Sequence, residues 1–220
     1  MATAHPARRR SGPNEFTMLP PPPPVVLILG TDAAGKDYVA EFLIRRWRAS
    51  GHRVAKRAGG FAAPAADARS SSERKGSGGR FQERAFLGLF PLLPAVAGWL
   101  LARDRRRFRP SALPLVVVSH TALRLLALFL GQHGDGWIAL LARHPELARA
   151  LRAVGPPGTM VAVLDVSPET RRRRIVARIQ SGTVDPLDDY MLADPERAER
   201  IERCLVELAT HYLNATVIRN

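Results

Sequence analysis

Cysteine is nearly absent from this chain of 220 residues, since Cys204 is the only one. A single thiol cannot form a disulfide within the chain or a metal site built from several cysteines, so both are excluded. Cys204 lies in a stretch with helical periodicity, where an isolated cysteine is usually a small apolar residue of the core. The lack of a disulfide framework predicts a reducing compartment, the cytoplasm.

Long uninterrupted apolar runs are also missing. The longest uncharged stretch, residues 85–102, is broken by Pro91 and Pro94. A membrane-spanning helix needs about 20 consecutive apolar residues, so a helix of the protein core is the favoured interpretation. A basic run at residues 103–109 follows directly, which leaves a membrane-surface role as the less favoured alternative. The arginines near the N-terminus precede no apolar run, and we therefore expect no signal peptide.

Acidic residues are few compared with basic ones. The chain has 20 Asp and Glu against 33 Lys and Arg, a formal net charge of +13. A strongly basic protein attracts anions such as nucleotides, nucleic acid and acidic lipid, and charge alone does not choose among them. The basic run at 103–109 contains only one aromatic residue, Phe108, so it resembles a solvated face more than a nucleic-acid site. An anionic ligand is predicted, and nucleic acid is not the favoured partner.

The chain divides into a disordered, proline-rich tail at residues 1–24 and one domain at residues 25–220. The tail ends in five consecutive prolines, which form an extended segment and not a packed element. In the domain, apolar runs typical of buried strands alternate with helical spacing, which indicates an α/β fold with a mostly parallel sheet. The predicted strands are 25–29, 54–57, 115–119, 160–166 and 215–219. The predicted helices are 36–49, 83–103, 121–130, 138–154, 168–180 and 195–213, with loops at 58–80 and 181–193.

Residues 30–37 read Gly-Thr-Asp-Ala-Ala-Gly-Lys-Asp and match the P-loop pattern G-x-x-x-x-G-K. In such a loop the glycines let the backbone approach phosphate oxygens, the amide groups form an anion cradle, and the lysine reaches the β- and γ-phosphates. A buried strand precedes the motif and an amphipathic helix follows it. The alternative, a tight turn that happens to contain lysine, does not explain that context. We therefore expect a nucleoside triphosphate to bind at Gly30, Thr31, Asp32, Ala33, Ala34, Gly35, Lys36, Asp37 and Tyr38.

Asp37 stands where a P-loop normally has Ser or Thr, whose hydroxyl binds magnesium. A carboxylate is also a hard oxygen ligand, although its charge weakens nucleotide binding without metal. Two interpretations stay open, a metal-dependent variant and a site that has lost its function. Asp165 ends another predicted strand and is the second candidate Mg²⁺ ligand, with helix capping as its alternative role. Because ligands gather at the carboxyl ends of parallel strands, Ser119, Asp165 and Gly30 are expected to face one crevice.

Two motifs together resemble the thymidylate kinase group of nucleoside monophosphate kinases. They are Asp32 within G-x-D-x-x-G-K, and Leu-Asp-Val-Ser-Pro-Glu at residues 164–169 with the arginine-rich helix behind it. The resemblance spans about residues 25–220 and is specific at its two ends. It implies a three-layer P-loop fold, ATP and Mg²⁺ as cofactors, and transfer of the γ-phosphoryl group to a small phosphorylated acceptor, with a nucleoside monophosphate favoured.

The resemblance also implies a lid at about residues 171–193. Arg171, Arg174 and Arg178 fall on one helix face, at i, i+3 and i+7. Together with Lys36 they are the predicted catalytic residues, because lid arginines neutralise charge on the transferred phosphoryl group. The alternative is a solvated basic face. Asp185, Asp188 and Asp189 follow, and could contact the same arginines when the lid is open.

The sequence departs from the group after the middle strand, where Ser119-His120 replaces its Asp-Arg pair. This favours a second hypothesis, a nucleotide-binding module without kinase activity. The opposite interpretation, an active site, is favoured by animal phosphomevalonate kinase and a phage deoxynucleotide kinase, which carry Gly-Lys-Asp in active P-loops. The Asp-Ala-Ala-Gly-Lys string is also similar to the second family of polyphosphate kinases, whose other motifs are absent. Residues 58–110 align with nothing, so the sequence does not identify which small phosphorylated acceptor is used. The sequence also leaves a homodimer open.

Overall fold

The computed structural model describes seven segments of the chain: residues 23–31, 33–57, 93–108, 115–119, 121–131, 136–182 and 188–219. Asp32, Asp185 and the predicted loop at 58–80 therefore lie outside the described residues. Of the predicted tail only Pro23 and Pro24 are described. The carbonyl of Pro24 accepts a hydrogen bond from the Val116 amide at 3.0 Å, so the chain has joined the sheet before its first strand begins.

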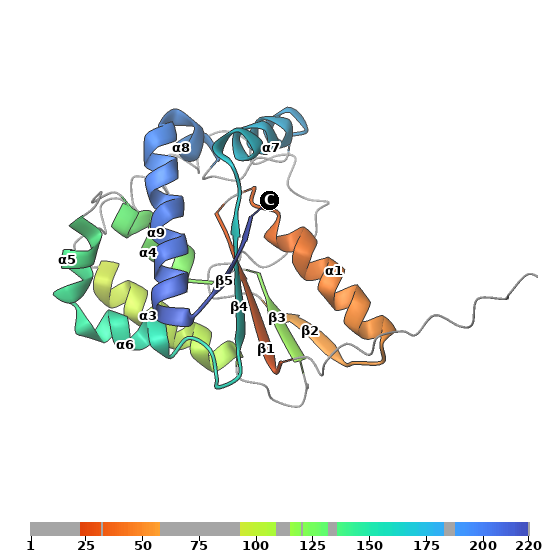
Figure 1. Ribbon diagram of the computed structural model, residues 1–220. Coiled ribbons are helices and arrows are strands. Elements are labelled where there is room, and N and C mark those ends of the chain that lie inside the picture. Colours follow the sequence, from red (N-terminus) through yellow and green to blue (C-terminus); the bar gives the residue numbers. More distant parts are fainter. Residues whose placement is uncertain are drawn as a thin grey trace, which may run out of the picture.

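The described residues form a five-stranded sheet in which every neighbouring pair is parallel (Figure 1). Its order is β2-β3-β1-β4-β5. The strands are β1 (Val25–Leu29), β2 (Val54–Arg57), β3 (Leu115–Val118), β4 (Met160–Asp165) and β5 (Thr216–Arg219). The central strand β1 is apolar at every position and wholly buried, as expected of a strand that is covered on both faces. The predicted α/β fold with about five mostly parallel strands is confirmed, and the sheet is parallel throughout.

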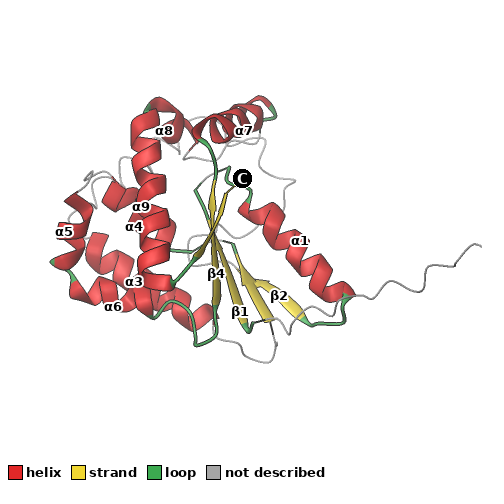
Figure 2. Ribbon diagram, in the orientation of Figure 1, coloured by secondary structure: helices red, strands yellow, loops and turns green. Residues whose placement is uncertain are grey.

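Helices cover both faces of the sheet and make three layers (Figure 2). On one face lies α1 (Lys36–Ala49), whose Ile44 and Trp47 pack with Val26 and Ile28. The larger core lies on the other face, with β1 contributing its alternate residues Val25, Leu27 and Leu29. That face carries α3 (Leu93–Phe108), α4 (Leu123–Gly131), α5 (Trp137–Ala142), α6 (Pro145–Arg152) and α9 (Pro195–Leu213). Beyond the edge where the strands end lie α7 (Pro168–Gln180) and α8 (Asp188–Ala193).

Three predicted elements differ from the structure. Residues 138–154 form two helices, because Pro145 lacks an N–H and keeps His144 out of the helical conformation, so that a new helix begins at Pro145. Part of the predicted loop at 181–193 is the short helix α8. The described helix α3 continues through the basic run as far as Phe108. Within the described segments, no helix combines the length and apolarity that a membrane span requires.

Cys204 lies in α9 and is 1% exposed, which confirms its predicted place in the core. Burial raises the pKa of its thiol to about 12, with a smaller contribution from the charge of Glu207. The thiol is therefore protonated at neutral pH and has little of the thiolate form that reacts as a nucleophile.

Gly131 is buried at the end of α4, where this helix packs against α9. A Cβ atom at this position would lie 2.7 Å from Cα of Ile201 and 3.0 Å from its backbone nitrogen. Because both are backbone atoms, a side chain could be accommodated only if the two helices moved apart. The absence of a side chain at Gly131 therefore permits the close approach of α4 and α9.

Gly131→Ala is expected to lower the free energy of unfolding by about 1–3 kcal/mol, the usual cost of an overpacked core, even though alanine is the better helix former. Gly136→Ala is the matched control, because a Cβ atom there meets nothing within 4 Å. Thermal and urea unfolding of both variants test this, and equal midpoints for the two would contradict the predicted clash.

Candidate phosphate-binding site at the P-loop

The loop between β1 and α1 has the geometry that its two glycines predict. Gly35 is the N-cap of α1 and adopts a left-handed conformation, φ 88°, which other residues rarely tolerate. At Gly30 the constraint is space, since a Cβ atom there would lie 2.9 Å from Cβ of Ala34. Gly35 has no side chain with which to cap the first amides of α1. The N-terminus of this helix therefore presents N–H groups and a positive dipole end, the arrangement that binds phosphate.

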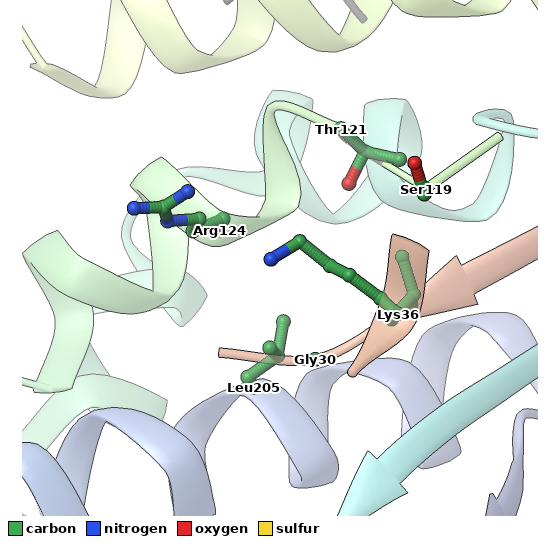
Figure 3. Close-up of a pocket in the computed structure, with 7 residues that line it drawn as sticks. Gly30, Lys36, Ser119, Thr121, Arg124 and Leu205 are labelled. Atoms are coloured by element: carbon green, nitrogen blue, oxygen red, sulfur yellow. The ribbon is translucent and has the colours of Figure 1, made fainter. Parts of the chain in front are cut away.

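Lys36 is buried within the loop that it follows. Its side chain is folded back, and Nζ donates a hydrogen bond to the carbonyl of Thr31 at 3.4 Å. Figure 3 shows it lying between Gly30 and Leu205 on one side and Thr121 and Arg124 on the other. These residues line a shallow depression with a water-accessible volume of about 10 Å³, and the described part of its lining contributes two cations and no carboxylate. Such a lining is suited to an anion.

Asp37 lies on the first turn of α1 and faces the end of β3. Its Oδ1 accepts a hydrogen bond of 2.7 Å from Oγ of Ser119, and Nζ of Lys56 lies 3.5 Å from the same oxygen. Lys56 also donates a 2.8 Å hydrogen bond to Glu41. Partial burial lowers the pKa of Lys56, but the hydrogen bond to Glu41 and the charges of Asp37 and Glu41 outweigh it and raise that pKa above its usual value. Lys56 therefore stays charged and balances the Asp37 carboxylate.

The three predicted lid arginines have different partners. Arg174 reaches the P-loop, where Nη1 donates to the carbonyl oxygens of Ala33 at 3.2 Å and Ala34 at 3.3 Å. Arg178 forms an ion pair with the buried Asp188 of α8, as the sequence anticipates for one of the acidic residues. Arg171 points into the protein and contacts α9. In this conformation only Arg174 touches the predicted phosphate site.

Arg171 and Glu202 form a buried ion pair behind the P-loop, with side chains that are 4% and 8% exposed. Arg171 also donates to the carbonyls of Val166 and Ala198, each at 3.4 Å. Burial lowers the pKa of Arg171, and the charges of Glu199 and Asp165 partly offset the shift. Glu202 Oε1 accepts a 3.4 Å hydrogen bond from the Thr31 hydroxyl. The ion pair thus joins α7 and α9 to the P-loop.

The structure separates the two predicted metal ligands. Asp165 ends β4 and lies 3.6 Å from Nε of Arg219 on β5, while Asp37 contacts Ser119 on β3. Because β1 lies between β3 and β4, the two carboxylates are on opposite sides of the P-loop strand. Gly30 and Ser119 share the predicted crevice, and Asp165 is not among its lining residues. Tyr38 is 72% exposed on the first turn of α1.

Lys56 and Glu202 are contact residues that the sequence reasoning missed. A signal for Lys56 exists, since the chain has only three lysines and the other one described is Lys36 of the P-loop. A signal for Glu202 exists too, because it falls on one helical stripe with Ala198, Leu205 and Ala209, where a carboxylate is unusual.

Among the described residues, no group of three or more His, Cys, Asp or Glu side chains could hold a metal. Magnesium in a P-loop protein needs few protein ligands, because phosphates and water supply the rest.

Glu202→Gln keeps the side chain's shape and removes the countercharge of Arg171. Because an uncompensated charge is then buried, the free energy of unfolding is expected to fall by about 3–5 kcal/mol. Glu196→Gln, on the same helix with a side chain that is 90% exposed, is the control and is expected to cost under about 1 kcal/mol. Arg171→Met with Glu202→Leu is expected to regain much of the loss. Urea unfolding measures all three, and a Glu202→Gln midpoint equal to that of the control would contradict a buried ion pair.

Comparisons with known proteins find structural similarity and no sequence-level match. No protein-family model matches the chain, and no curated protein matches it. The deoxyadenosine kinase from M. mycoides with bound dATP is similar in structure, with a TM-score of 0.51, 13% identity, and coverage of 88% of this chain and 89% of that one. The same enzyme with bound dCTP has a TM-score of 0.49 at 13% identity, with 89% of each chain covered.

Thymidylate kinase from Ehrlichia chaffeensis has a TM-score of 0.43 at 16% identity, covering 89% of this chain and 86% of its own. At these identities the similarity concerns the fold alone, and the comparison of folds rests on the structure with bound dATP. The parallel five-stranded sheet, the P-loop after its central strand and the flanking helices agree with it. The chain therefore has a three-layer α/β fold similar to that of this deoxyadenosine kinase.

Proposed function

We propose that the protein is an ATP-dependent phosphotransferase that acts on a small phosphorylated acceptor, with a nucleoside monophosphate as the favoured one. The observation that carries this proposal is a P-loop built around the buried Lys36, onto which Arg174 of α7 is docked. A P-loop alone supports nucleotide binding. An arginine brought to the loop from a separate helix supports group transfer, because charge on the moving phosphoryl group must be neutralised.

The donor triphosphate would lie against the loop amides and the N-terminus of α1, with Lys36 at the β- and γ-phosphates. The residues present fit a magnesium ion, because Asp37 is a hard oxygen donor whose side chain is 52% exposed beside that site. Bound Mg²⁺ neutralises phosphate charge and fixes the geometry of the triphosphate. Asp165, held against Arg219, is the less favoured ligand in this arrangement.

Arg174 is the best supported of the proposed catalytic arginines, since its guanidinium already lies at the P-loop. Arg171 and Arg178 would reach a phosphoryl group only after leaving Glu202 and Asp188. We assign Arg171 a positioning role, because its partner Glu202 holds Thr31 of the loop. Arg178 would hold the lid segment through α8 until a ligand draws it away.

The acceptor's phosphate would meet the second cation of the depression, Arg124 of α4. Arg124 lies four residues after the position where the thymidylate kinase group has its arginine, and it lines the same depression as Lys36. Positioning of two phosphorylated molecules by fixed cations accounts for most of the catalysis that phosphoryl transfer requires.

A nucleotide-binding module without transfer is the second candidate. The contacts of Asp37 with Ser119 and Lys56 favour it, because they occupy the residue that would hold the metal. The two candidates predict the same nucleotide binding and differ in turnover.

Lys36→Ala is expected to reduce turnover by about 100-fold or more, because loss of one preorganised charge at a developing anion has costs of this size. ADP formation would be measured with Mg-ATP and a panel of nucleoside monophosphates. Arg45→Ala is the control, since it removes an exposed cation from the same helix. Nucleotide binding without ADP formation on any acceptor would support the non-catalytic module instead.

Arg174→Ala is expected to lower kcat by about 100-fold or more with a smaller effect on ATP affinity, because the arginine acts mainly on the transition state. Arg173→Ala removes the neighbouring charge, which is exposed on the same helix, and serves as the control. Steady-state kinetics and equilibrium nucleotide binding would be measured for both. Equal kcat for the two variants would contradict the assigned role of Arg174.

A further inference from the structure

The hydrogen bond between Asp37 and Ser119 joins two positions at which the chain departs from the usual P-loop pattern. Asp37 replaces the hydroxyl that normally follows the P-loop lysine, and Ser119 stands at the end of β3, where the thymidylate kinase group has a carboxylate. In P-loop proteins the hydroxyl of the loop and a carboxylate at a strand end hold magnesium together. Here the same two chemical groups are present in contact, with Oγ 2.7 Å from Oδ1, and each occupies the other's position.

We propose that Asp37 and Ser119 form an exchanged magnesium site, in which the P-loop supplies the carboxylate and strand β3 supplies the hydroxyl. This inference rests on the proposed function and goes further, because it names the ligand pair and explains both departures by a single exchange. The carboxylate missing after β3 is replaced by Asp37, and the hydroxyl missing from the loop is replaced by Ser119.

The chemistry of the pair permits both contacts at once. A hydroxyl has one proton and two lone pairs, so Ser119 can donate to Asp37 and still present an oxygen lone pair to a cation. Asp37 has two carboxylate oxygens, and its side chain is 52% exposed, so an ion can reach it. Ser119 is 2% exposed and lines the depression with Lys36 and Gly30 (Figure 3), which places the pair beside the expected phosphates.

Lys56 makes a carboxylate tolerable at this position. Without a compensating charge, Asp37 would repel the triphosphate that Lys36 attracts. Lys56 Nζ lies 3.5 Å from Asp37 and 2.8 Å from Glu41, so its ammonium group offsets one of the two negative charges while metal is absent. Half-exposed ion pairs of this kind are weak. A divalent cation can therefore bind Asp37 in place of Lys56, while Lys56 remains paired with Glu41.

A charge-exchange experiment tests the site with four proteins: the unaltered chain, Asp37→Ser, Ser119→Asp, and the double variant with both changes. The affinity of a non-hydrolysable ATP analogue is measured by calorimetry, with Mg²⁺ and with EDTA. Bound Mn²⁺ is followed by electron paramagnetic resonance in the presence of the nucleotide. Neither readout depends on turnover, and thermal unfolding reports the stability of each variant.

In Asp37→Ser, the factor by which Mg²⁺ raises nucleotide affinity is expected to fall by about tenfold or more, because the carboxylate ligand is gone. Ser119→Asp is expected to bind nucleotide more weakly in EDTA, because two carboxylates then face the phosphates. In the double variant, the factor by which Mg²⁺ raises nucleotide affinity is expected to return to within about threefold of its value in the unaltered chain. Such a recovery would show that the two positions are coupled.

A folded double variant that binds metal no better than Asp37→Ser would overturn the exchange, as would full metal enhancement in Asp37→Ser itself. If the double variant does not fold, Ser119→Ala is the deciding variant. An unchanged Mn²⁺ signal, with an unchanged increase in nucleotide affinity on adding Mg²⁺, would overturn the role of Ser119. A reduced Mn²⁺ signal would support that role. Absence of nucleotide binding by the unaltered protein would overturn the proposed function. Nucleotide binding without recovery in the double variant would overturn the exchange alone.

Discussion

All the described strands run in one direction, so every strand ends at the same edge of the sheet. This constraint brings residues from distant parts of the sequence to one place, because a parallel sheet collects the carboxyl ends of its strands. The P-loop follows β1, Ser119 follows β3, and Lys56 lies near the end of β2. On the other side of β1 the same edge holds Asp165 and Arg219. The arrangement splits the polar residues into two groups, and only the group on the β3 side contacts the P-loop helix through Asp37.

Charge at the site is distributed more specifically than the net charge of +13 suggests. Arginine supplies nearly all the cations of the chain, yet a lysine, Lys36, lies within the P-loop and another, Lys56, contacts Asp37. A lysine ammonium is a compact point charge, suited to a phosphate or a single carboxylate oxygen, whereas arginine is suited to planar, bidentate partners. Arg171 fits that distinction, since its two terminal nitrogens donate to different carbonyls while it also pairs with Glu202. Lys56 and Arg174 do not fit it, because Lys56 is shared between Asp37 and Glu41 and Arg174 uses one nitrogen for two carbonyls.

Local signals in the sequence predict the strands, most helices and the P-loop, because each depends on residues close together in the chain. The apolar run of β1 and the glycines at 30 and 35 are sufficient for the loop. Pro145 is a local signal for the break between α5 and α6, although the helical periodicity of residues 138–154 predicts one continuous helix. The contacts between Asp37 and Ser119 and between Thr31 and Glu202 join residues 82 and 171 positions apart, so no local pattern reports them. Which arginine of α7 faces the loop likewise depends on how that helix packs.

The position of the carboxylate also has a physical rationale within the helix. An aspartate on the first turn of α1 is stabilised by the positive end of the helix dipole, a benefit that a carboxylate at the end of β3 would lack. The same dipole attracts phosphate, so Asp37 and the ligand compete for it unless a cation lies between them. Lys56 offsets that competition in the absence of metal, and a divalent ion would remove it entirely by binding both anions. A carboxylate in this P-loop is therefore compatible with phosphate binding, more weakly with Lys56 alone and most strongly when nucleotide and metal bind together.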